Sequence, residues 1–336
     1  MINNPVKNFV EKLSIKNNPK VVVVGGGTGL SVLLRGLKKL TPNITAIVTV
    51  ADDGGGSGIL RQEMGMLPPG DIRNCMVALA EVEPLFSELI NYRFTEGSLK
   101  GQSFGNLFLA AMNGISPNFE TAVHNMSNVL KVRGRVLPVT VDNVNLEATL
   151  VNGEKVLGES RIPEVAREQN SKIKKTSLVP ADVTPLPEAL EAIAEADLII
   201  LGPGSLYTSI IPNLLVKGVP EAIYTSKAPT VYVCNIMTQP FETSDYTAYD
   251  HYKAIIDHSY NTIVDYCVVN STSIDDVKRD KYSKEGSVPV KVDRDKFKDT
   301  QVQILEADLI NPQDPLAHHD TEKLAKLLIS ICKSKR

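Results

Sequence analysis

The feature that most constrains this fold is a run of four valines at residues 21–24, followed at once by a glycine-rich loop. Leucines then recur on one side of residues 31–40, as they do on an amphipathic helix. A second β-branched run occupies residues 44–50. A wholly apolar strand is typical of a parallel sheet that is covered on both faces. The order strand, helix, strand therefore predicts a parallel βαβ unit.

The same alternation continues along the chain. Further strands are predicted at 197–201, 230–235 and 264–270, and helices at 71–81, 103–115, 118–130, 245–259 and 321–332. Residues 136–160 differ, because polar and apolar residues alternate around Asn152 and Gly153, which predicts a hairpin. We therefore expect an α/β fold, a Rossmann-like three-layer α/β/α domain with a mostly parallel sheet and a β-hairpin excursion. The expected boundaries are an N-terminal extension at 1–19, a single domain at 20–332 and a hairpin insertion at about 141–160.

Composition and charge exclude several classes of protein. The net charge is −3, which argues against a nucleic-acid binder that relies on bulk basic charge. Aromatic residues make up only 5% and Trp is absent, so stacking platforms have little to be built from. The four cysteines are far apart, which excludes a zinc cluster and suggests buried free thiols. With no signal peptide or membrane span in the sequence, we expect a cytoplasmic protein.

The first candidate site is the loop after the valine strand, formed by Gly25, Gly26, Gly27, Thr28 and Gly29. Glycines let backbone N–H groups approach a phosphate, and a helix N-terminus favours negative charge. A tight turn without a ligand is the simpler alternative, but four glycines in five residues exceed what a turn needs. Leu30 stands where the dinucleotide fingerprint needs glycine, and no Lys-Ser/Thr pair follows. The loop is thus predicted to be a phosphate loop of another kind.

A second loop in the same context follows the strand at 197–201. It consists of Gly202, Pro203, Gly204 and Ser205, with Leu206 opening the next helix. Loops at the carboxyl ends of parallel strands converge on one crevice. Two such loops suggest a diphosphate or nucleotide-diphosphate ligand, the alternative being an independent turn.

Carboxylates follow the strand at 44–50. Asp52, Asp53 and Ser57 lie in one glycine-rich loop, and Asp71 and Asn74 open the helix at 71–81. An acid at such a strand end meets a ribose hydroxyl in Rossmann proteins, and paired carboxylates also hold hard cations. Asp53 and Asp71 are the candidate Mg²⁺ ligands. A helix cap or a surface turn is the alternative for these residues.

Several polar residues elsewhere are weaker candidates. Ser103 and Asn106 open an otherwise apolar helix, Asn235 ends a strand, and His318 precedes the last helix. A capped helix explains the first two equally well, and Asp320 or Thr321 is expected to cap the last helix. The histidines at 124, 251 and 258 are expected on helices and facing solvent, and the charge-rich residues 278–298 are expected to form a solvated surface segment. There is no G-x-S-x-G elbow, and no nucleophile is singled out.

Taken in order, these motifs resemble those of the CofD/YvcK family. The matching segments are VVVVGGGTGLSVLLRGLK, TVADDGGGSGILR, LPPGDIRNCMVALAE, GQSFGNLFLAA, LGPGSLYTSIIPNLLV and NIMTQPFET. The family contains 2-phospho-L-lactate transferases and bacterial gluconeogenesis factors, and the YvcK branch is the closer resemblance. It implies a Rossmann-like, CofD-like nucleotide-binding domain.

The two branches imply different functions. In the transferase branch a phospholactyl group passes from a guanosine diphosphate donor to a deazaflavin alcohol, with a divalent metal held by aspartates. The YvcK branch implies a regulatory protein that binds a UDP-sugar such as UDP-N-acetylglucosamine and acts in cell shape, cell-wall synthesis and growth on gluconeogenic carbon. A homodimer and regulatory protein partners are expected with it. Whether the chain is an enzyme stays open.

The resemblance also assigns residues. It implies that Gly26, Gly27, Thr28 and Gly29 meet the diphosphate or sugar, that Asp52 or Asp53 and Asp71 occupy the acidic positions, and that Gly204, Ser205 and Leu206 form the second phosphate loop. Two positions depart from the family pattern. Gln102 stands where the family usually has His, and Gln does not exchange protons near neutral pH. His318 stands where it often has Arg, which would be permanently charged.

The motifs and the composition leave three candidate functions. A regulatory UDP-sugar binder is favoured. A phospholactate-type transferase is the alternative, but few aromatics are available to line a channel for a flat acceptor. A nicotinamide-dependent enzyme would need the missing third glycine.

Overall fold

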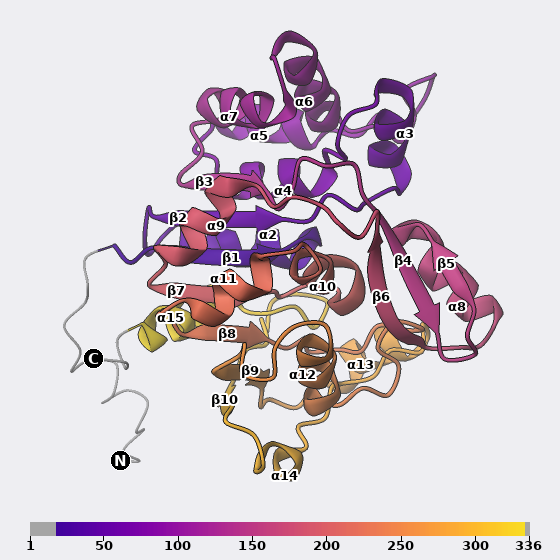
Figure 1. The fold of residues 1–336 in the computed structure, drawn as a ribbon, viewed down its shortest axis with the longest axis vertical. Helices are drawn as coiled ribbons and strands as arrows, with labels where there is room; N and C mark the ends of the chain where they lie inside the picture. The colour runs from indigo at the N-terminus through magenta and orange to yellow at the C-terminus, as the bar shows by residue number, and fades with distance from the viewer. Residues whose placement is uncertain (1–17, 333–336) are drawn as a thin grey trace.

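The structure, a computed structural model, describes residues 18–332, so almost all of the N-terminal extension expected at 1–19 lies outside the described residues. A seven-stranded parallel sheet runs through the molecule in the order β10-β9-β8-β7-β1-β2-β3 (Figure 1). Its strands are β1 (Val21–Gly25), β2 (Ile44–Val48), β3 (Arg135–Pro138), β7 (Leu198–Leu201), β8 (Thr230–Val233), β9 (Tyr266–Asn270) and β10 (Gln303–Ala307). The predicted mostly parallel α/β fold is confirmed.

The first strand lies at the point where the strand order reverses. β1 pairs in parallel with β2 on one side and with β7 on the other. The chain builds the sheet outward from β1 to β3, then returns to β7 and builds toward β10. Loops after β1 and β7 therefore diverge to opposite sides and leave a crevice between them, as at the switch points of other open sheets.

Helices cover both faces of the sheet (Figure 1). On one face α2 packs between α4 and α15, and on the other α9, α10 and α11 pack together. This division follows because right-handed crossovers on the two sides of β1 place their helices on opposite faces. The helices of the first face are α2 (Gly27–Leu37), α4 (Gly70–Leu79) and α15 (Thr321–Ile331), and those of the second are α9 (Pro187–Ala194), α10 (Ile211–Leu214) and α11 (Val219–Thr225). Between the two faces, the four valines of β1 are at most 2% exposed.

Two groups of elements extend beyond the main sheet. Helices α3 (Gly55–Met64), α5 (Pro84–Asn91), α6 (Phe104–Ile115) and α7 (Phe119–Val129) lie beyond β3, at the top of Figure 1. The predicted hairpin is present as β4 (Asn145–Leu150) and β5 (Lys155–Leu157), and it turns at Gly153, whose φ is +92°. A third strand, β6 (Ile173–Val179), pairs antiparallel with β4. The short helices η1 (Glu159–Arg161) and α8 (Ile162–Glu168) connect β5 to β6.

The structure corrects several local predictions. The residues from Val136 that were assigned to the antiparallel excursion begin with β3, which pairs in parallel with β2 at the sheet edge. Residues 278–298 are not simply a solvated segment, because they contain most of α13 (Asp276–Ser283) and α14 (Arg294–Phe297), with Lys278 buried. His251, on α12 (Ala248–Asp257), is buried rather than facing solvent, and His258 accepts a hydrogen bond from the N–H of Thr176. Within residues 18–332, no helix has the length and apolar character needed to cross a bilayer.

Candidate functional site

A crevice of about 570 Å³ opens at the carboxyl ends of β1, β7 and β8, where the strand order reverses. Its walls come from the two glycine loops, from residues 235–242, from the segment around α13 and from the start of α15. Seven of the predicted site residues line it: Gly27, Thr28, Gly29, Gly204, Ser205, Asn235 and His318. The structure thus brings together side chains and loops that are up to 291 positions apart in the sequence, from Gly27 to His318.

The two glycine loops pack directly against each other. A Cβ on Gly29 would lie 2.8 Å from the carbonyl oxygen of Pro203, and one on Gly204 would lie 3.2 Å from the carbonyl oxygen of Gly26. Gly27 has a φ of +69°, in the left-handed region that favours glycine. Part of the glycine content is therefore required by loop packing, whether or not a ligand is bound.

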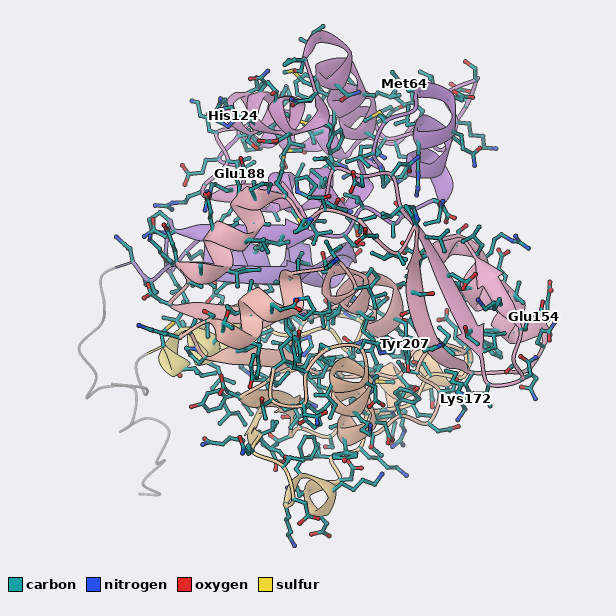
Figure 2. The ribbon with its side chains drawn as sticks, in the orientation of Figure 1. Met64, His124, Glu154, Lys172, Glu188 and Tyr207 are labelled. Carbon is teal, nitrogen blue, oxygen red and sulfur yellow. The ribbon has the colours of Figure 1, made fainter. Side chains whose placement is uncertain are left out.

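At each loop, a carboxylate accepts a hydrogen bond from a backbone N–H group. The Oδ2 of Asp71 accepts the N–H of Gly27 at 2.7 Å, and the Oε1 of Glu242 accepts the N–H of Tyr207 at 2.8 Å (Figure 2 labels Tyr207). Burial raises the pKa of Asp71 to about 6 and that of Glu242 to about 7. Both groups therefore titrate near neutral pH. Glu242 lines the crevice and was missed by sequence reasoning, because nothing in the local sequence TQPFET shows which loop it caps.

The second loop is followed by an unusual helical turn. Residues Leu206–Ile210 form a π-helix, η2, and all five are buried. The predicted ligand contact Leu206 is 0% exposed and does not line the crevice. The loop reaches the crevice through Gly204 and Ser205 instead, and the Oγ of Ser205 accepts a hydrogen bond from Gln239 at 2.7 Å.

Further carboxylates lie behind the first loop. Burial raises the pKa of Asp52, which accepts the N–H of Gly54 at 2.9 Å and is also hydrogen-bonded to Ser57. Burial likewise raises the pKa of Glu159 well above its ordinary value, and the charges of Asp52 and Asp71 raise it further. The sequence analysis predicted the aspartates on this side of the site. It did not predict Glu159, which lies in η1, directly after β5 of the small three-stranded sheet.

The expected Mg²⁺ pair, Asp53 and Asp71, is not brought together. Asp53 accepts the N–H of Ser160 at 2.8 Å, whereas Asp71 accepts the N–H of Gly27. The carboxylate whose charge raises the pKa of Asp71 is Asp52. In the part of the chain that the structure describes, no three His, Cys, Asp or Glu side chains are grouped so as to hold a metal ion. The residues present do not form a ready Mg²⁺ site, and no step below uses one.

Other predicted residues lie behind the crevice and hold helices together. The side chain of Ser103 caps α6 by accepting the N–H of Asn106 at 3.2 Å, and the Oδ1 of Asn106 accepts from Arg73 at 3.1 Å. Asn74 is half-buried on α4. Gly26 is shielded, because a Cβ there would lie 2.5 Å from Asp71. Gln102 is buried, and its Oε1 has no hydrogen-bond partner within residues 18–332.

The two neighbouring histidines differ sharply. His318 is half-exposed, and its Nδ1 lies 2.9 Å from Asp314. Burial lowers the pKa of His319 to about 4, so this ring is neutral near pH 7. The buried Nε2 of His319 has no partner among the described residues, and the side chain was not singled out from sequence. Asp320 caps α15, as expected, by accepting the N–H groups of Glu322 and Lys323.

Comparison with known proteins identifies the family. The family described as 2-phospho-L-lactate transferase CofD matches residues 21–310. The chain is 49% identical to the gluconeogenesis factor of Bacillus subtilis, over 94% of this chain and 98% of that one. It is 50% identical to the gluconeogenesis factor of Halalkalibacterium halodurans, over 92% and 95%.

A solved structure shows the same fold. The crystal structure of a UPF0052 family protein from Bacillus halodurans superposes with a TM-score of 0.88, at 50% identity, over 92% of this chain and 98% of that one. The family match spans both glycine loops, the aspartates and Glu242, and the relatives cover nearly the whole chain. This chain belongs to the CofD family and is similar over nearly its whole length to gluconeogenesis factors.

Proposed function

We propose that the crevice binds the diphosphate of a UDP-sugar, such as UDP-N-acetylglucosamine, and that the protein is a regulatory gluconeogenesis factor. The observation that carries this proposal is the convergence of both glycine loops on one cavity of about 570 Å³. Such a cavity is in the size range of small-molecule sites. Its position at the switch point of the sheet is where open α/β folds bind nucleotides.

The first loop provides the groups that a phosphate needs. It leads into the eleven-residue helix α2, whose first-turn N–H groups have no acceptors within the helix and carry partial positive charge. Thr28 is exposed at this end, so its hydroxyl is available to a ligand. On the far wall, Asn235 and Ser205 add polar groups.

The acidic side suits the sugar rather than the diphosphate. Carboxylate oxygens accept hydrogen bonds from hydroxyl groups, and Glu242 lines the crevice. Burial raises the pKa of Glu242 to about 7, which favours its neutral form relative to an exposed carboxyl and so reduces its repulsion of a bound diphosphate.

Binding is tested by thermal unfolding and calorimetry with UDP-N-acetylglucosamine, GDP, NAD and a flavin, each with and without magnesium. A ligand at about 100 times its Kd raises the unfolding free energy by about 2.7 kcal/mol. The variant Thr28→Glu places a carboxylate in the first turn of α2, where helix stability favours it but an anionic ligand does not. We expect UDP-sugar affinity to be at least about tenfold lower in Thr28→Glu than in the neutral, size-matched Thr28→Gln, because both variants remove the hydroxyl and only the first adds a negative charge. Equal affinities in the two variants would remove the first loop from the proposed site.

The cellular role rests on the names of the relatives. We propose a cytoplasmic, homodimeric protein without a nucleic-acid partner, needed for cell shape and cell-wall synthesis when cells grow on gluconeogenic carbon. Deletion of its gene should cause shape defects on such carbon sources and not on glucose, and complementation with Thr28→Glu should fail. Restoration of shape by that variant would separate the cellular role from ligand binding.

A transferase of the 2-phospho-L-lactate type is the second candidate. It is supported by the family match over residues 21–310 and by the buried carboxylates Asp52 and Asp71 beside the crevice. Purified protein incubated with the guanosine diphosphate donor and a deazaflavin alcohol tests it directly. Formation of the phospholactyl product would favour a transferase over a purely regulatory protein.

A further inference from the structure

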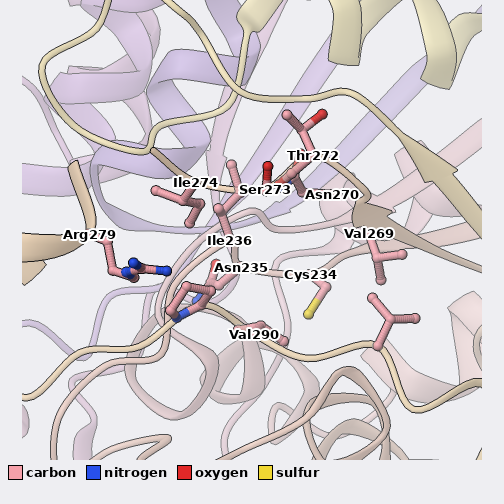
Figure 3. A pocket seen from close by; sticks show the side chains of 12 residues that line it. Cys234, Asn235, Ile236, Val269, Asn270, Thr272, Ser273, Ile274, Arg279 and Val290 are labelled. Carbon is pink, nitrogen blue, oxygen red and sulfur yellow. The ribbon is translucent and has the colours of Figure 1, made fainter. Parts of the chain in front are cut away.

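Helices α5, α6 and α7 form a surface that takes no part in the crevice. They lie beyond β3, at the top of Figure 1, where α6 packs against both α5 and α7. A smaller cavity of about 240 Å³, shown in Figure 3, shares Asn235 and Ile236 with the crevice and so belongs to the same site. Among the described residues, those that line either cavity all lie outside 81–133, so the proposed ligand does not account for this surface.

The helical segment is poor in charged residues. Residues 101–130 contain one Asp, Glu, Lys or Arg, which is Glu120, whereas the average of 22% for the whole chain would give about seven. An exposed helix normally carries charged side chains on its outer face. The twelve residues of α6, FGNLFLAAMNGI, include none. Depletion of charge is a property of the centre of protein interfaces rather than of a surface that stays in water.

Apolar side chains form an exposed stripe on α5. Leu85, Leu89 and the C-capping Tyr92 recur at helical spacing and are 78%, 43% and 49% exposed. Ile90 is the one buried residue of this helix. α5 therefore presents to water the kind of stripe that a helix normally packs against a neighbour.

Helix α6 is apolar on its outer side as well as on its inner side. Leu109 and Ala110 are buried against the core. The residues that the helical period places on the opposite side are all apolar: Phe104, Phe108, Ala111 and Ile115. Ile115 is 81% exposed, and the half-buried rings of Phe104 and Phe108 stack with their centroids 6.1 Å apart. A helix that is apolar on both sides is typical of one that is covered on both sides.

The charge pattern favours a second copy of this chain as the cover. In a two-fold dimer the same patch faces itself, so every charge on it meets a like charge, and an uncharged patch avoids this repulsion. An anionic membrane surface would instead be bound by Lys and Arg around the apolar residues. Residues 81–133 contain four Lys or Arg against five Asp or Glu, which gives no basic rim.

We propose that this chain forms a two-fold homodimer through an α5–α6 face, defined by the apolar residues Leu85, Leu89, Tyr92, Phe104, Phe108 and Ile115. The interface rests on the homodimer of the proposed function and not on its ligand. Helices α5 and α6 of the two copies would pack with their apolar stripes at the centre, as the helices of a bundle do. Both crevices stay open, because no described residue that lines them lies on this face.

Sedimentation velocity over a range of protein concentrations tests the interface. The wild-type chain should sediment with twice the mass of one chain. The single variants Leu85→Glu and Ile115→Glu each bring like charges together across the two-fold axis, and we expect each to raise the dimer dissociation constant at least about tenfold. Both positions are more than three-quarters exposed within one chain, so its fold should tolerate them. Val151→Glu adds the same charge at a valine that is 65% exposed on the small sheet, and it should leave the dimer unchanged.

Circular dichroism and UDP calorimetry on the same samples separate loss of the interface from loss of the fold. Each variant should keep the wild-type spectrum and bind UDP within about twofold of wild type. Any glutamate variant that does not fold is replaced by Leu85→Ser or Ile115→Ser, for which we also expect a weaker dimer. A monomeric wild-type protein, or dimers of wild-type strength in both Leu85→Glu and Ile115→Glu, would overturn the α5–α6 interface. A wild-type dimer that binds no UDP-sugar would instead overturn the proposed ligand and leave the interface standing.

Discussion

The two glycine loops look alike in sequence and differ in structure. Each follows a buried strand, precedes a helical turn and has an acidic side chain at one of its N–H groups. The first leads into an α-helix of eleven residues and presents Thr28 to solvent. The second leads into a buried π-turn of five residues, whose Tyr207 N–H donates to Glu242.

This difference separates packing from binding. Each loop has one N–H bonded to a carboxylate, that of Tyr207 to Glu242 at the second loop and that of Gly27 to Asp71 at the first. The second loop runs into a turn whose five residues are all buried, whereas the first presents Thr28 to solvent. We therefore propose that the first loop holds the diphosphate and that the second shapes the wall opposite. Glycine content alone would have assigned both loops the same role.

The largest expected effect concerns Asp71. Its folded-state pKa of about 6 lies above the ordinary 3.8, so burial disfavours the ionised form. That difference corresponds to roughly 3 kcal/mol of unfolding free energy. This stability is lost as the pH rises from the ordinary pKa of 3.8 to the folded-state pKa of about 6, and it stays lost at higher pH. Asp71→Asn keeps an acceptor for Gly27 and removes the charge, so it should stabilise the protein above about pH 7 and lose that gain toward about pH 4. Chemical denaturation at several pH values measures this, and a gain independent of pH would refute the assignment.

A smaller loss is expected where the two loops touch. A Cβ on Gly29 would lie 2.8 Å from the backbone of the second loop, so Gly29→Ala forces the loops apart. Overpacking of this kind costs about 1–3 kcal/mol. Gly114→Ala is the matched control, because nothing lies within 4 Å of its added Cβ. Equal melting temperatures for the two variants would show that the loops do not need each other.

Binding should also depend on pH through Glu242. A bound diphosphate raises the pKa of this carboxyl above its value of about 7 in the free protein, so binding takes up protons. Affinity for UDP should therefore fall as the pH rises above about 7, by up to about tenfold. The variant Glu242→Gln should flatten this dependence. Asp71 and Glu159 lie on the same side and can add to the slope, so Asp71→Asn is measured in parallel. An unaltered slope in Glu242→Gln would place the diphosphate away from the second loop's carboxylate.

The smallest effect is expected at His318. Half-exposed and paired with Asp314, it lies on the rim of the crevice. His318→Arg places a permanent positive charge at this position. We expect at most about a threefold gain in UDP affinity near pH 8, since exposed charge pairs contribute little. Equal UDP affinities of the two proteins at this pH would show that His318 does not meet the ligand.

The sequence was most informative where the pattern was local. Continuous apolar runs predicted β1, β7 and β8, since strands buried on both faces leave no polar alternation. The edge strand β10 was missed because its five residues mix polar and apolar side chains and none is fully buried. β3 was assigned to the wrong sheet because its four residues do not show which strand they pair with.

Part of the site could be predicted from the sequence in the same way. Motifs at strand ends predicted Gly27, Thr28 and Asn235, and the family resemblance pointed to His318 before the last helix; all four line the crevice. Glu242 and His319 were missed because their roles depend on contacts with distant parts of the chain. Conversely, Asn106 looked like a site residue because it is polar on an apolar helix, yet it bonds Arg73 inside the protein.

The central claim is that the first glycine loop, and not the second, binds the diphosphate. Backbone amide resonances of ¹⁵N-labelled protein titrated with UDP report on the N–H groups themselves. The account predicts that the resonances of Thr28 and Gly29 shift saturably with the calorimetric Kd, while those of Tyr207 and Thr208, in the buried π-turn, shift little. Larger saturable shifts at Tyr207 and Thr208 than at Thr28 and Gly29 would contradict it.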